Sequence, residues 1–145
     1  MASYEKRTWW TRHGLTDRLQ DEEFLEAVIS TAFLVAAADG SASDVEYDAL
    51  LDRLEILGGI DRDRIDQLLT IASNDVEANG FEPRIARIAQ LVVNDAAAEA
   101  ALMVGLAVAL ADDVVTAEER ETAQKIATAL GVKVDLDAML AEIRG

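Results

Sequence analysis

The sequence contains no cysteine, and His13 is its only histidine. The lack of cysteine excludes disulfide bridges, thiolate chemistry and the zinc or iron–sulfur sites that cysteines hold. With one histidine in the chain, neither a Ser-His-Asp triad nor a histidine-based metal site is expected. No glycine-rich phosphate loop is present either. These absences favour a protein that is not an enzyme.

Proline and aromatic residues are also scarce, since the chain has one proline and 5% aromatic residues. Hydrophobic residues nevertheless make up 51% of the 145 residues, so the core has to be built mainly from Ala, Leu, Ile and Val. Long stretches of Ala, Leu, Glu, Asp and Arg favour helix over sheet. Length and composition therefore predict a single all-α domain.

No segment predicts a membrane span or a secretion signal. The two most apolar stretches, 27–38 and 100–111, are shorter than the roughly 20 residues that a helix needs to cross a bilayer. The N-terminus carries charges but has no apolar signal-peptide core. We therefore expect core helices at both stretches and a cytoplasmic location.

The chain is strongly acidic, with 28 acidic and 13 basic residues and a net charge of −15. Binding to nucleic acid requires a basic surface, so no nucleic-acid partner is expected. Metal cations and basic proteins are the favoured partners of such a chain. The oligomeric state is left open.

Residues 1–20 differ from the rest because they carry a net charge of +2, whereas residues 21–145 carry −17. We interpret 1–20 as a basic N-terminal appendage and 21–145 as the helical domain. Trp9, Trp10 and Arg12 are its candidate partner-binding residues, for a protein or for an anionic membrane surface. Alternatively, the tryptophans fold back over the core, or the segment is a flexible tail.

Seven helices are predicted after residue 20 from apolar spacing and capping residues. Their expected ranges are 21–38, 43–57, 61–73, 83–93, 95–111, 116–130 and from 135 onwards. Their expected N-caps include Asp21, Ser43, Asp61, Asp95, Thr116 and Asp135. Ser43 with Glu46, and Thr116 with Glu119, have the spacing of capping boxes. Pro83 is well placed in the first turn of its helix.

A shift of 73 residues matches positions of the first half with positions of the second. Each half then contains a long apolar helix, an acidic corner and an amphipathic helix that ends in glycine. The matched pairs include Asp39 with Asp112, Ser43 with Thr116, Glu46 with Glu119 and Gly58 with Gly131. This pattern indicates two pseudo-symmetric halves.

The acidic corners are the candidate metal site, formed by Asp39 and Glu46 in the first half and by Asp112, Asp113 and Glu119 in the second. An aspartate at a helix C-terminus faces the negative end of the helix dipole, at a cost of roughly 0.3–1 kcal/mol. A bound cation would remove this cost, and carboxylates suit hard ions such as Ca²⁺, Mg²⁺ or Mn²⁺. Alternatively, the glutamates complete capping boxes and the aspartates bond only to their local turns.

The paired corners resemble the tellurite-resistance TerB family. The similar stretches are VAAADGSASDVE and VALADDVVTAEE, and the resemblance extends from about Phe24 to Leu130. It implies an all-α fold of about seven helices in two pseudo-symmetric halves, an acidic surface that binds divalent metal, and a role in stress complexes that resist tellurite. It carries the family's acidic positions onto Asp39, Glu46, Asp112 and Glu119. This sequence departs from the family at Asp113, where glycine is usual.

Two functions follow from these observations. The first is a non-enzymatic, TerB-like stress-response domain whose acidic surface binds divalent metal and a protein partner. The alternative is a metal-independent helical interaction module, anchored by its tryptophan-containing N-terminal segment. Divalent cations are expected to stabilise the first and to leave the second almost unchanged. An enzyme with carboxylate catalysis would instead need a deep pocket lined by two buried carboxylates.

Overall fold

The computed structural model describes residues 8–38, 44–112 and 114–144, without the side chains of residues 8, 44–46 and 112. All regular elements in these ranges are helices, which confirms the predicted all-α class. In chain order they are α2 (Thr8–Arg12), α3 (Leu15–Arg18), α4 (Glu22–Ala36), α5 (Asp44–Asp52), the π-helix η1 (Arg53–Leu57), α6 (Arg62–Asn79), α7 (Phe81–Leu91), α8 (Asp95–Ala109), the 3₁₀-helix η2 (Leu110–Asp112), α9 (Ala117–Ala129) and α10 (Leu136–Arg144).

The helices α4 to α10 correspond to the seven helices expected after residue 20. Most of the predicted caps are present, since Asp21, Asp61, Thr116 and Asp135 accept hydrogen bonds from backbone N–H groups of the first turn. Ser43 lies outside the described residues. The pseudo-symmetric relation between the two halves remains a prediction.

Three local predictions need correction. The N-cap of α8 is Asn94 rather than Asp95, because the Asn94 side chain accepts a hydrogen bond from Ala97 N at 2.8 Å. Helix α6 continues to Asn79 instead of ending near Ser73, since no helix-stopping residue precedes Gly80. Residues Arg53–Leu57, which were expected to continue the helix over 43–57, form the π-helix η1. The apolar spacing did not indicate this change of helix type.

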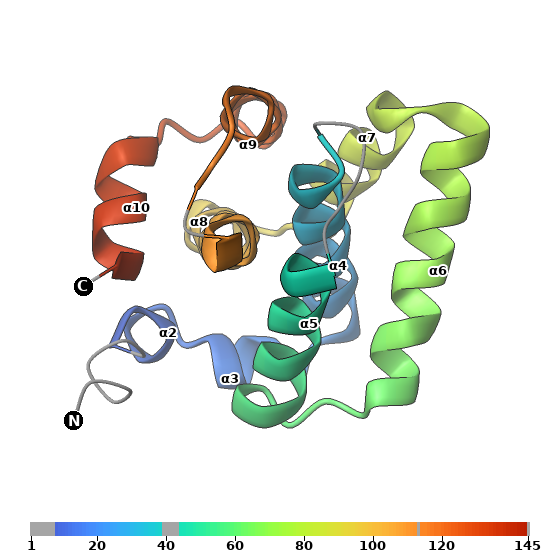
Figure 1. The fold of residues 1–145 in the computed structure, drawn as a ribbon, viewed down its shortest axis with the longest axis horizontal. Coiled ribbons are helices and arrows are strands. Elements are labelled where there is room, and N and C mark those ends of the chain that lie inside the picture. The colour runs from blue at the N-terminus through green and yellow to red at the C-terminus, as the bar shows by residue number, and fades with distance from the viewer. Residues whose placement is uncertain (1–7, 39–43, 113, 145) are drawn as a thin grey trace.

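Helices α4 and α8 form the centre of the fold, and almost all of their residues are buried. Figure 1 shows α8 nearly end-on beside α4. Gly105 lies at this contact, where a Cβ atom would be 3.1 Å from Cγ2 of Thr31. The glycine therefore allows the two helices to approach closely. The other helices pack around this pair, with α6 and α7 against α4, α10 against α8, and α9 against both.

A network of charged side chains joins α4, α6 and α7. The buried guanidinium of Arg84 donates to Asp75 Oδ2 at 2.9 Å and to Glu26 Oε2 at 3.3 Å. Arg87 donates to the same Glu26 carboxylate from the surface, at 3.0 Å. Arg84 Nη1 also donates to Ser30 Oγ at 3.4 Å, so three side chains accept from the one arginine that is buried among the described residues.

The described part of the N-terminal segment contributes to the same core. Trp9, Trp10, Leu15 and Leu19 are all buried there. The boundary expected at residue 20 therefore does not separate two cores in the described part of the chain. None of the described helices has both the length and the apolar character that crossing a bilayer requires.

Candidate functional site

The first acidic corner follows the C-terminal end of α4. The last turn of α4 carries no basic residue that would offset the negative end of its dipole. Asp39 lies outside the described residues, and Glu46 lies in the first turn of α5 with a side chain that is also outside the description. The proposed ligand and capping roles of these two residues remain predictions.

The second corner follows α8, whose end continues into η2 before α9 begins. Asp113 and the side chain of Asp112 lie outside the description. Glu119 is described, and it forms the predicted capping box with Thr116. Its Oε1 accepts a hydrogen bond from Thr116 N at 2.8 Å, and its own N–H donates to Thr116 Oγ1 at 3.1 Å. The capping role of this buried glutamate is confirmed.

Helix α5 contacts the segment that leads into the second corner. This helix follows the first corner, and it packs against both α8 and η2, which lead into the second corner. In Figure 1 the end of α8 lies beside α5. Segments separated by some 60 residues of chain are thereby brought together, a relationship that the sequence left open.

The positively charged side chain of Arg53 lies near the end of α8. Arg53, the first residue of η1, places Nη1 3.5 Å from the carbonyl oxygen of Ala107. Burial lowers the pKa of its guanidinium. Helix α8 has no basic residue in its own last turn. The positive charge of Arg53 partly offsets the negative end of the α8 dipole. No basic side chain in the last turn of α4 does the same for the first corner.

The described side chains alone do not assemble a metal site. No group of three or more acidic, histidine or cysteine side chains in the described ranges has an arrangement that holds a metal ion. A site at the corners therefore depends on Asp39, Glu46, Asp112 and Asp113. Their donor set fits a hard divalent cation, since all four offer carboxylate oxygens.

The N-terminal candidates have different environments. Trp9 and Trp10 are only 3% and 4% exposed, and their rings form an edge-to-face pair with centroids 5.7 Å apart. Trp10 Nε1 donates to Thr16 Oγ1 at 2.9 Å. The indoles thus fold back over the core, as the alternative interpretation holds, and do not form an exposed docking surface. Burial of two large apolar rings accounts for this placement.

Arg12 remains at the surface, where its guanidinium lies 2.5 Å from Glu142 on α10. The hydrogen bonds and charge of Glu142 raise the pKa of Arg12. Its role in binding a partner stays a prediction. Within this structure, Arg12 connects the start of the chain with its last helix.

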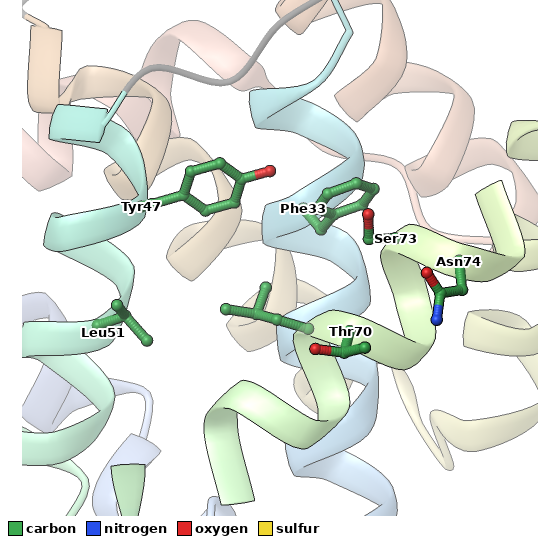
Figure 2. A pocket seen from close by; sticks show the side chains of 7 residues that line it. Phe33, Tyr47, Leu51, Thr70, Ser73 and Asn74 are labelled. Carbon is green, nitrogen blue, oxygen red and sulfur yellow. The ribbon is translucent and has the colours of Figure 1, made fainter. Parts of the chain in front are cut away.

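The sequence did not indicate a groove that lies between α5 and α6. Its lining combines apolar side chains with the polar edge of α6 and surrounds a volume of about 290 Å³. The lining residues are Phe33, Tyr47, Leu51, Leu69, Thr70, Ser73 and Asn74. Figure 2 shows their side chains as sticks. These residues come from three helices that are separated in the chain. Periodicity identifies the face of each helix but does not show which faces meet.

Comparison with known families identifies the domain. The sequence model described as tellurite resistance protein TerB matches residues 25–139 of the chain. The chain belongs to the TerB family. The TerB match begins in α4, ends in α10 and includes both acidic corners, so the family resemblance seen in the sequence is confirmed. Comparisons with curated proteins and with solved structures find no match.

Proposed function

We propose that this TerB domain acts without catalysis in a tellurite-resistance-type stress response, and that its acidic corners bind a divalent cation. Membership of the TerB family supports the domain type. The packing of α5 against η2 is the observation that carries the cation proposal. It supports a shared site, in which carboxylates from the two corners would bind one ion that two carboxylates from a single corner would bind only weakly.

The ligand roles divide unequally between the five candidate residues. Glu119 uses Oε1 in its capping box, so its first role is to fix the start of α9. Asp39, Glu46, Asp112 and Asp113 are the proposed ligands. A cation held by them would offset the dipole ends of α4 and α8, reduce carboxylate repulsion and tie the corners together. It would also change the surface charge that a partner protein meets.

Thermal unfolding tests the proposal. The chelator-treated protein is heated with and without millimolar Ca²⁺, Mg²⁺ or Mn²⁺ at constant ionic strength. An ion present at a hundred times its Kd adds about 2.7 kcal/mol, which corresponds to a shift of several degrees in Tm. We expect a selective shift for one ion and its loss in the double variant Asp39→Asn/Asp112→Asn.

A matched control separates site binding from general charge effects. Asp66 and Glu77 are exposed on α6 and form no ion pair among the described residues, so Asp66→Asn/Glu77→Gln removes two carboxylates elsewhere. This variant is expected to keep the metal-induced shift. Equal shifts in both double variants, or no shift beyond the ionic-strength control, would contradict a metal site at the corners.

The second candidate function is a metal-independent interaction module. Burial of Trp9 and Trp10 gives no support to anchoring through exposed indoles, whereas the acidic surface remains available to a basic partner.

The proposal that the domain is not an enzyme has its own support. Glu119 is the one carboxylate residue among the buried polar groups of the described chain, and it caps α9.

A further inference from the structure

The groove between α5 and α6 has an apolar floor and an apolar wall along α5, while its α6 wall also carries the polar side chains of Thr70, Ser73 and Asn74. Phe33 of α4 lies at its base, Tyr47 and Leu51 line it from α5, and Leu69 lines it from α6. Figure 2 shows Tyr47 pointing from α5 toward Phe33, and their rings stack with centroids 6.4 Å apart. Both α5 and α6 pack on α4, so three packed helices frame the groove. Its volume of about 290 Å³ accommodates a few side chains of a partner rather than a whole helix.

The rims of the groove are acidic and their charges are not neutralised. Asp48 and Asp52 are exposed on α5 and lie next in sequence to the lining residues, while Asp66 and Glu77 are exposed on α6. None of these four side chains forms an ion pair or hydrogen bond among the described residues. The stretches 44–52 and 65–79 contain no lysine or arginine.

Helical spacing places the charges beside the groove. Asp66, Thr70, Ser73 and Glu77 are separated by three or four residues, so they share one face of α6. Thr70 and Ser73 of this face line the groove. The apolar surface is therefore flanked by carboxylates, which attract lysine or arginine side chains at short range.

The helices that form the groove favour a helical partner over an extended peptide. All of its lining residues lie in helices, where backbone N–H and C=O groups are used within each helix. An extended peptide would find no free strand edge to pair with, whereas a helix satisfies its own backbone. Apolar side chains spaced by three and four residues on such a helix would enter the groove, and basic side chains beside them would meet the rims.

We propose that this groove is a docking site for a basic amphipathic helix of a partner protein. The proposal rests on the partner-binding part of the proposed function and gives that partner a chemistry. It does not depend on a bound cation. Tests carried out in the presence of a chelator therefore distinguish its failure from failure of the metal site.

The probe is a fluorescent synthetic helix of about five turns, with leucines on one face and lysines on both flanks of that face. Binding is followed by fluorescence anisotropy, and the contacted residues are mapped by amide chemical shifts of the ¹⁵N-labelled protein. The control peptide has the same composition with its leucines distributed around the helix. We expect only the first peptide to shift amides around Tyr47, Leu51, Leu69 and Ser73.

A pair of variants on α6 tests the location. Thr70→Arg places a bulky cation at the edge of the groove and is expected to weaken binding at least about tenfold. Ala78→Arg adds the same charge at an exposed position that does not line the groove, and should bind nearly as well as the wild type. Circular dichroism and Tm verify that both variants are folded.

Four results would overturn the proposal. Equal binding of the two peptides would indicate nonspecific attraction to an acidic protein. Equal losses in Thr70→Arg and Ala78→Arg, or amide shifts spread over the acidic surface away from α5 and α6, would place binding elsewhere. Concentration-dependent shifts of the groove amides without peptide would identify a second copy of this chain as the occupant.

Discussion

The guanidinium of Arg53 lies over the indole ring of Trp9, 6.0 Å from the ring centroid. The same side chain reaches the carbonyl oxygen of Ala107 near the end of α8. Three segments, namely α2, η1 and α8, therefore meet around one half-buried cation. Arg53 connects Trp9 with the C-terminal part of α8.

Replacing Arg53 by methionine tests this connection. The substitution keeps an unbranched apolar side chain but removes the cation and its hydrogen-bond donors, so we expect a loss of about 1 kcal/mol in the free energy of unfolding. Tryptophan fluorescence should change because the charge beside Trp9 is lost. Arg120→Met is the control, since the Arg120 side chain is 40% exposed and pairs with the largely exposed Asp137. Unchanged stability and emission in Arg53→Met would refute the connection.

Arg84 and Arg87 share an acceptor but differ in burial, which makes them a matched pair. The Arg84 side chain is 8% exposed and the Arg87 side chain is 47% exposed, and both bond to Glu26. Arg84→Met leaves Asp75 and Glu26 without their buried cation and is expected to cost about 2–3 kcal/mol of stability, because these carboxylates keep some contact with water. Arg87→Met should have little effect. Urea unfolding measures both, and similar losses would contradict the assigned importance of burial.

Asp75 should make stability depend on pH in the acidic range. Hydrogen bonds from Asn79 and Arg84 lower the pKa of Asp75, that from Asn79 being the larger cause. A carboxyl group with a lowered folded pKa contributes stability above its ordinary pKa of about 3.9, and this contribution disappears as the pH falls through the folded value. Asn79→Ala should therefore raise the pKa of Asp75 and destabilise the protein at neutral pH.

The measurement for this variant is a carboxyl NMR titration of Asp75, with urea unfolding at neutral and acidic pH. The stability difference between wild type and Asn79→Ala should narrow on acidification, since Asp75 is then protonated in both. Asn74→Ala, at an exposed position of the same helix, provides the control. If the pKa of Asp75 is unchanged in Asn79→Ala, the hydrogen bond from Asn79 is not the cause of its lowering.

Thr31 offers a stabilising substitution. Its Oγ1 is buried at the contact between α4 and α8 and has no hydrogen-bond partner among the described residues. Thr31→Val keeps the side-chain shape and replaces the unsatisfied hydroxyl by a methyl group, so an increase of about 1 kcal/mol in the free energy of unfolding is expected. Thermal and urea unfolding test this directly. A decrease would indicate that the hydroxyl does find a partner in solution.

Much of the helical pattern was predictable because its signals are local. Apolar residues spaced by three and four define α4 and α8, and Thr116 with Glu119 marks the start of α9 within a single turn. The errors are also local in origin. Asn94 and Asp95 are both good N-caps, and their neighbouring positions make the choice between them sensitive to the exact path of the chain.

The candidate sites were less predictable because they combine distant segments. The acidic residues of each corner are visible in the sequence, but the proximity of α5 to η2 depends on how α5 packs against α4 and α8. Whether Trp9 and Trp10 are buried likewise depends on contacts between the N-terminal segment and later helices. One of these contacts is the hydrogen bond that Thr16 Oγ1 donates to the carbonyl oxygen of Leu57. No repeat or motif in residues 1–20 indicates those contacts.

The sequence by itself determined the all-α class, the acidic surface, the caps of most helices and the TerB resemblance. Each of these depends on composition or on residues within one or two helical turns. Only the tertiary structure decided that the indoles join the core, that α5 meets η2, and that Phe33, Tyr47 and Leu69 form one groove. Those outcomes depend on which helix faces pack together, and that choice is made by burial and shape across the whole chain.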